Sequence, residues 1–118
     1  MGAQVKGSGD KRSVLLDGEL TLPNAQPLRS AFLKALVESD DVSLLFENVR
    51  EVDLSCLQLL CSAHRSAARL QKRFVIEGPV PPALRDAAEE AGFSRLHGCR
   101  LDRDGSCIWI TVAGGNND

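Results

Sequence analysis

The amino-acid sequence predicts a single α/β domain in which helices pack on a mostly parallel sheet of four to five strands. Short β-type segments alternate with amphipathic helical segments, in the expected order β-β-α-β-α-β-α-β. Successive parallel strands need crossover connections that return over the sheet, and the helical segments supply them. The 118 residues are enough for one such domain and too few for two ordinary ones.

Two short strands and a helix are expected in the first forty residues. Residues 13–16 are a β-type apolar run, and Asp17-Gly18 offers turn chemistry before the alternating residues 19–22. Asn24 is expected to cap a helix that extends to about Ser39. Leu33 and Val37 lie outside its apolar face, either as scattered surface residues or as part of a contact. That face has the spacing of a packed helix and consists of Ala25, Leu28, Ala31, Phe32, Ala35 and Leu36.

The alternation continues through the second half of the chain. Residues 42–46 and 74–77 are expected to be strands, with a helix from Ser55 to about Arg73 between them. A helix from about Pro82 to Ala91 follows, and residues 107–112 are the last predicted strand, after a turn at 102–105. The predicted organisation is a flexible leader at 1–10, the domain at 11–113 and a flexible tail at 114–118.

Composition and charge argue against several functional classes. The net charge of −2 gives no overall electrostatic reason to bind nucleic acid or an anionic membrane. No apolar run approaches the roughly 20 residues that span a bilayer, and the N-terminus lacks a signal-peptide core, so a cytoplasmic protein is expected. The four cysteines lack paired ligand spacing and are expected to be small buried residues, with no metal or cofactor.

The segment 56–73 has an uneven charge distribution on a helical wheel. Its polar side carries cations and no acid, whereas exposed helices usually mix signs at i, i+4. Cations near a helix C-terminus complement the macrodipole, which accounts for Lys72 and Arg73 better than for Arg65. The alternative is a face that binds an acidic partner. The polar side consists of Gln58, Ser62, Arg65, Ser66, Arg69, Lys72 and Arg73.

The start of the same helix carries a second signal, in the turn Asp53-Leu54-Ser55. Backbone N–H groups point outward at a helix N-terminus, and either Asp53 or Ser55 can cap them. The same geometry suits a phosphoryl group on Ser55, which would add nearly two negative charges to the surface. Capping alone accounts for both residues, and a phosphorylation switch is the sharper alternative.

Three segments, Leu15-Leu-Asp-Gly-Glu-Leu20, Leu44-Leu-Phe-Glu-Asn48 and Val52-Asp-Leu-Ser-Cys-Leu-Gln-Leu-Leu60, together resemble a STAS domain, the fold of bacterial anti-sigma factor antagonists. In antagonists the last segment usually contains Asp-Ser-Ser/Thr-Gly-Leu, so the resemblance implies that Ser55 is the residue that a partner kinase phosphorylates. Leu54 replaces the usual first hydroxyl residue and Cys56 the usual glycine. Any side chain in place of that glycine adds bulk to the turn that a kinase must approach.

The resemblance implies a regulatory protein without enzymatic activity. The expected partner is a protein: an anti-sigma factor of the serine-kinase type, the ATPase of a lipid-transporting ABC system, or a chemotaxis or two-component protein. The sequence contains no recognisable set of catalytic residues, since His64 lies toward the apolar side of its helix and His97 has no obvious catalytic partner. The predicted partner-binding residues are Asp53, Leu54, Ser55, Cys56, Gln58, Ser62, Arg65 and Arg69.

Overall fold

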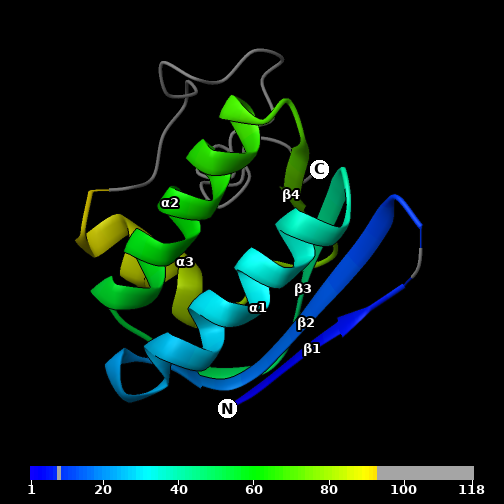
Figure 1. Ribbon diagram of the computed structural model, residues 1–118. Coiled ribbons are helices and arrows are strands. Elements are labelled where there is room, and N and C mark those ends of the chain that lie inside the picture. Colours follow the sequence, from blue (N-terminus) through cyan, green and yellow to red (C-terminus); the bar gives the residue numbers. More distant parts are fainter. Residues whose placement is uncertain (8, 93–118) are drawn as a thin grey trace.

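The computed structural model describes residues 1–7 and 9–92, and within them a four-stranded sheet in the order β1-β2-β3-β4 (Figure 1). Strand β1 (Gly2–Lys6) is antiparallel to β2 (Lys11–Leu20), whereas β2, β3 (Asp41–Val52) and β4 (Arg73–Ile76) are parallel to one another. The predicted α/β class with a mostly parallel sheet is confirmed. The strand predicted at 107–112, the turn before it and the tail lie outside the described residues.

The leader predicted for residues 1–10 must be corrected, because Gly2–Lys6 forms the edge strand β1. Ala3 and Val5 pair in register with Leu16 and Val14 and pack against the core. A Cβ at Gly2 would come within 2.6 Å of the Asp17 carboxylate, which is the end of a flexible side chain and can move aside. The glycine that suggested flexibility in the sequence is therefore part of a paired strand.

The two strands predicted on either side of Asp17-Gly18 are a single strand, β2. The register with β3 shifts between Asp17 and Gly18 and again between Gly18 and Glu19, and Gly18 has a positive φ of 80°. These are the features of a β-bulge, in which a glycine takes the left-handed conformation and the strand continues. The continued strand brings Leu20 beside Val52, at the end of the sheet where α2 begins.

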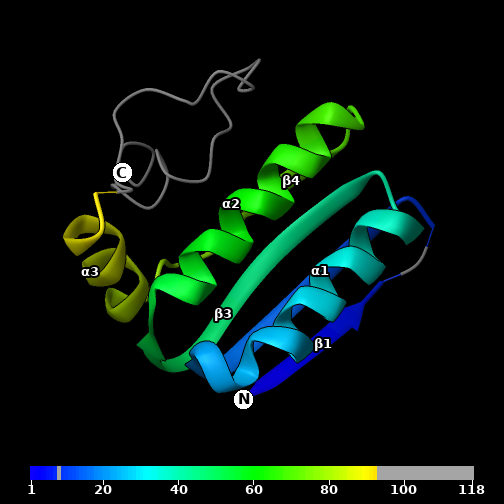
Figure 2. The ribbon, with the colours of Figure 1, turned by 60° about the vertical axis from the view of Figure 1, so that its left-hand side comes forward.

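Helices α1 (Ala25–Glu38) and α2 (Leu54–Arg69) lie side by side over one face of the sheet (Figures 1 and 2). Helix α3 (Pro82–Glu90), predicted nearly to its ends, lies near the start of α2 in both views. The predicted apolar face of α1 is confirmed, and its buried members are Leu28, Ala31, Phe32, Ala35 and Leu36. Leu33 and Val37 are exposed.

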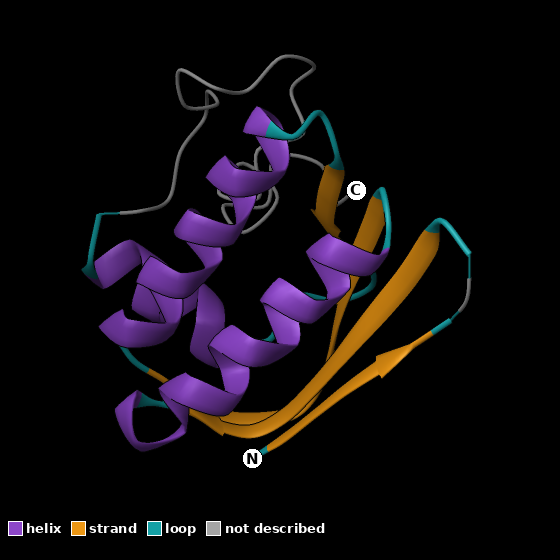
Figure 3. Ribbon diagram, viewed as in Figure 1, coloured by secondary structure: helices purple, strands orange, loops and turns teal. Residues whose placement is uncertain are grey.

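A short 3-10 helix, η1 (Leu22–Asn24), precedes α1 and connects it to β2 (Figure 3). Asn24 occupies the N-cap position of α1 as predicted, but its side chain does not cap the helix. The amide Nδ2 instead donates to the Glu19 carbonyl at 2.8 Å, and the Asn24 N–H donates to Thr21. These bonds give residues 21–24, called the Leu22 turn below, a fixed internal structure.

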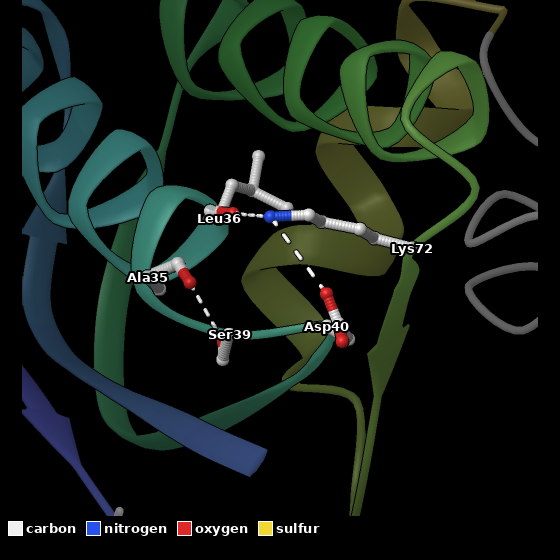
Figure 4. A network of polar contacts seen from close by, with 5 residues as sticks. All are labelled: Ala35, Leu36, Ser39, Asp40 and Lys72. Atoms are coloured by element: carbon white, nitrogen blue, oxygen red, sulfur yellow. Dashed lines mark hydrogen bonds and ion pairs between the residues drawn. The ribbon is translucent and has the colours of Figure 1, made fainter. Parts of the chain in front are cut away.

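Helix α2 ends at Arg69, four residues earlier than predicted, and the chain reverses through Gln71 with a φ of 59°. Lys72 then reaches the end of α1, where its Nζ donates to the Leu36 carbonyl and lies 4.0 Å from Asp40 Oδ1 (Figure 4). Lys72 therefore complements the C-terminal end of α1, and Arg73 begins β4. Neither residue belongs to the polar side of α2, which corrects the sequence interpretation.

Candidate functional site

The candidate site is built around Asp53, where β3 passes into α2. Asp53 has extended backbone angles and occupies the N-cap position of α2. Its N–H donates to the Leu20 carbonyl at 3.3 Å, and its own carbonyl accepts from Leu57 N–H in the first turn of the helix. The residue therefore belongs both to the end of the sheet and to the start of the helix, which fixes where its side chain points.

The Asp53 carboxylate uses both oxygens. Oδ1 accepts from the backbone N–H groups of Ser55, at 3.0 Å, and of Cys56, at 3.4 Å, and from the Ser55 hydroxyl. Oδ2 accepts from the N–H of Leu22 at 2.9 Å, across 31 positions of sequence. The cap predicted from the sequence is therefore made by Asp53, and the same side chain ties the Leu22 turn to the start of α2.

This arrangement shifts the pKa values of Asp53 and Cys56 in opposite directions. Partial burial acts to raise the pKa of Asp53, but hydrogen bonds from the Ser55 hydroxyl and from the N–H groups of Leu22, Cys56 and Ser55 outweigh it, and the net pKa lies below the usual 3.8. Burial, with a smaller contribution from the Asp53 charge, raises the pKa of Cys56 to about 12. The carboxylate is thus held ionised, and the thiol stays protonated despite its position at a helix N-terminus.

The surface around this cap combines one hydroxyl with exposed apolar side chains. Ser55 is half-buried, and its hydroxyl donates to Asp53. Leu54 is 51% exposed at the first position of α2, and Leu22 is 68% exposed on the turn that Asp53 holds. Cys56, which the sequence places in the binding set, is fully buried, so it offers no side chain to a partner.

The outer side of α2 continues from the turn as an exposed polar surface. Its sixteen residues include no aspartate or glutamate. The helix carries two cations, Arg65 and Arg69, where the sequence interpretation counted four. Leu54 and Arg69 are separated by about 22 Å along the helix axis. The exposed residues predicted on this side are Gln58, Ser62, Arg65 and Arg69, and all four lie there.

The family model described as "Mlab, STAS domain" matches residues 3–98 of the 118. The chain belongs to the STAS domain family. The fold is also similar to the anti-sigma factor antagonist SpoIIAA in its unphosphorylated form, with a TM-score of 0.64 and 19% identity over 78% of this chain and 82% of the other. A second similar structure is the Bacillus cell fate determinant SpoIIAA in its phosphorylated form, with a TM-score of 0.62 and 19% identity over 78% and 85%. No curated protein sequence matches significantly.

Other residues of this STAS domain fit a structural role. His64 is 6% exposed within the apolar side of α2, as the sequence predicted, and His97 lies outside the described residues. Cys56 and Cys61 are free thiols.

Among the residues that the structure describes, no group of three or more potential ligands is placed to hold a metal ion. In the same part of the chain, no helix has the length and apolar character needed to cross a membrane.

Leu22 is the site residue that sequence reasoning missed. The sequence assigned it to a strand, yet its side chain is exposed and its N–H is held by Asp53. A leucine directly before Pro23 was the available signal, because the residue before a proline is usually extended and begins a turn. Its pairing with Asp53 depends on tertiary structure, which no local pattern encodes.

Proposed function

We propose that this STAS domain is a non-enzymatic regulatory protein of the cytoplasm that binds a signalling protein through the Ser55 turn and the outer side of α2. The contact surface consists of Leu54, Ser55, Gln58, Ser62, Arg65 and Arg69, with Asp53 as the residue that positions the turn. Phosphorylation of Ser55 acts as the switch that weakens binding. The resemblance to anti-sigma factor antagonists makes an anti-sigma factor of the serine-kinase type the first candidate partner.

The observation that carries the proposal is the placement of the Ser55 hydroxyl, at the rim of a capped helix start beside the exposed Leu54. A phosphoryl group here adds nearly two negative charges next to the Asp53 carboxylate and to an apolar side chain. The phosphoryl group opposes the binding of a partner that packs on Leu54, since its charge must be desolvated in the complex. One modification would therefore change binding strongly.

The charge of α2 supports a partner surface that carries acidic residues. Arg65 and Arg69 are exposed, four residues apart and without an acid anywhere in their helix. Complementary charges of this kind mainly raise the association rate and fix orientation. Arg65 and Arg69 lie about 11 and 15 residues after Leu54, which corresponds to about 16 and 22 Å along the helix axis. We therefore expect carboxylates on the partner at about these distances from the group that contacts Leu54.

A second candidate function is a constitutive subunit, docked through the same surface on the ATPase of a lipid-transporting ABC system. It is favoured by the two departures from the antagonist pattern, Leu54 in place of a hydroxyl residue and Cys56 in place of glycine. Leu54 enlarges the apolar contact, which suits a permanent interface more than a reversible one. In this case Ser55 would be unmodified in cells.

The two functions are separated by capturing the partner with the intact chain and measuring the phosphorylation of Ser55 by mass spectrometry in native cells. A kinase-like partner and a phosphorylated fraction at Ser55 support the switch. A transporter ATPase with an unmodified Ser55 supports the subunit. Capture that is unaffected by Arg65→Glu and Arg69→Glu together contradicts the proposed surface. Lys34→Glu, an exposed cation on α1, is the matched control and is expected to leave capture unchanged.

A further inference from the structure

The Leu22 turn and the start of α2 share one acceptor. Asp53 Oδ1 takes the donors of Ser55 and Cys56, and Oδ2 takes the N–H of Leu22 at 2.9 Å. Two oxygens of a planar carboxylate move together, so a shift of Oδ1 away from the helix also displaces Oδ2. Leu22, whose N–H this carboxylate accepts, and Leu54, which follows Asp53 in the chain, both have exposed side chains.

We propose that Asp53 couples the chemical state of Ser55 to the Leu22 turn, so that Leu22 and Leu54 form one partner-binding apolar surface only while Ser55 is unmodified. The inference rests on the proposed function for its partner. It adds Leu22 as a further contact residue and identifies the Asp53 carboxylate as the group that links Leu22 to Ser55. Asp53 acts here as a positioning residue.

The physical steps start from the hydroxyl proton of Ser55, which is donated to Asp53 Oδ1. A kinase transfers the γ-phosphoryl group of a nucleoside triphosphate: the Oγ–P bond forms, the bond to the leaving nucleoside diphosphate breaks, and the hydroxyl proton passes to a base of the kinase. Oγ then has no proton to donate. The phosphate repels the carboxylate and competes for the N–H groups of Ser55 and Cys56, since a helix N-terminus attracts anions.

The Leu22 turn has few other ties to α2. Its other hydrogen bonds are local and include those from Asn24 N–H to Thr21, from Asn24 Nδ2 to Glu19 and from Ala25 N–H to the Leu22 carbonyl. The Leu22 side chain is 68% exposed and contributes little packing. Once the carboxylate moves, the turn keeps its internal structure but loses this bond to Asp53, and it stays connected to the start of α2 through the neighbouring Leu20, whose carbonyl accepts the Asp53 N–H. The Leu22 side chain is then less well fixed relative to Leu54. A partner that needs both leucines then has to reorder the turn, which lowers its affinity.

The coupling is tested on the intact chain without any partner, by amide hydrogen exchange at Leu22 measured with NMR. Ser55→Asp supplies the charge, Ser55→Glu is a second mimic should the first fold poorly, and Ser55→Ala removes only the hydroxyl. We expect the Leu22 amide to exchange roughly tenfold faster in the charged variants and within about twofold of wild type in Ser55→Ala. The amide of Asn24, bonded inside the turn, is the internal reference and should stay unchanged.

Two results overturn the coupling: a Leu22 amide that is as protected in the charged variants as in wild type, or one that is released together with the Asn24 amide, which indicates general unfolding of the turn. Failure of the proposed function is distinguishable from both. If Ser55→Asp abolishes partner binding while Leu22 stays protected, the binding site stands and the coupling is wrong. If Leu22 is released while the partner still binds at full affinity, the coupling of Leu22 to Ser55 stands, but the proposed switch and the contact role of Leu22 are both wrong.

Discussion

Removing the Asp53 side chain tests whether this residue organises the site. Asp53→Ala deletes the acceptor of the Ser55 and Cys56 N–H groups and of the Leu22 N–H. Loss of an N-cap side chain costs about 1 kcal/mol, with a range of about 0.5 to 2. A hydrogen bond to a charged acceptor contributes about 1.5 to 3 kcal/mol when it is sheltered, and the Leu22 bond is exposed, so water recovers part of it. We expect a total loss of about 2 kcal/mol.

The assay is urea denaturation of the intact chain, followed by far-UV circular dichroism, with the free energy of unfolding extrapolated to water. Asp86→Ala is the matched control, because it removes an exposed acid from the middle of α3, and we expect a change within about 0.5 kcal/mol. An Asp53→Ala protein as stable as wild type, with an unchanged dependence on urea, would refute the role of Asp53 as the cap and as the tie to the Leu22 turn.

Three further predictions follow from the same contacts. Because folding lowers the pKa of Asp53 from 3.8, the ionised cap stabilises the fold fully above that pH, and this stabilisation is lost as the pH falls through the folded-state pKa. The difference in the free energy of unfolding between wild type and Asp53→Asn should therefore narrow below about pH 4. A difference that stays constant with pH would contradict the prediction. Cys56 is buried with a pKa of about 12, whereas Cys61 is partly exposed. Under native conditions at pH 8, iodoacetamide should therefore label Cys61 well before Cys56, as measured by peptide mapping. Equal labelling of the two cysteines would contradict the burial of Cys56. Lys72→Met should destabilise the fold by about 1 kcal/mol in thermal denaturation, because the Leu36 carbonyl loses its donor, while a more stable variant would show that the charge contributes nothing there.

The helices were largely predictable because their signals are local. Leu28, Phe32 and Leu36 recur with the period of a helix, and all three are buried against the sheet. The end of α2 was not predictable in the same way. The residues after Arg69 continue a helical pattern, but Lys72 makes its contacts with α1, and only the folded chain supplies that carbonyl.

The strand β1 and the contact between Asp53 and Leu22 were missed for a related reason. Gly2 suggests flexibility in the sequence, whereas in the fold it pairs with Asp17 at the start of β1. The cap at Asp53 was expected from its position before a helix, and its three hydrogen bonds from Ser55 and Cys56 are local. Its bond to Leu22 spans 31 positions, so it follows from the pairing of β2 with β3 and not from any short pattern.

Binding at the start of α2 is the central claim, and two exposed apolar side chains on different helices test it directly. Leu54 is 51% exposed at the first position of α2, and Val37 is 80% exposed on α1, outside the proposed surface. The measurement is the affinity of the captured partner for Leu54→Asp and for Val37→Asp, each shown to be folded. An apolar contact at the centre of an interface contributes about 2 kcal/mol or more, so Leu54→Asp should weaken binding by roughly thirtyfold or more and Val37→Asp by less than about twofold. Full affinity in Leu54→Asp, or a loss confined to Val37→Asp, would contradict the proposed site.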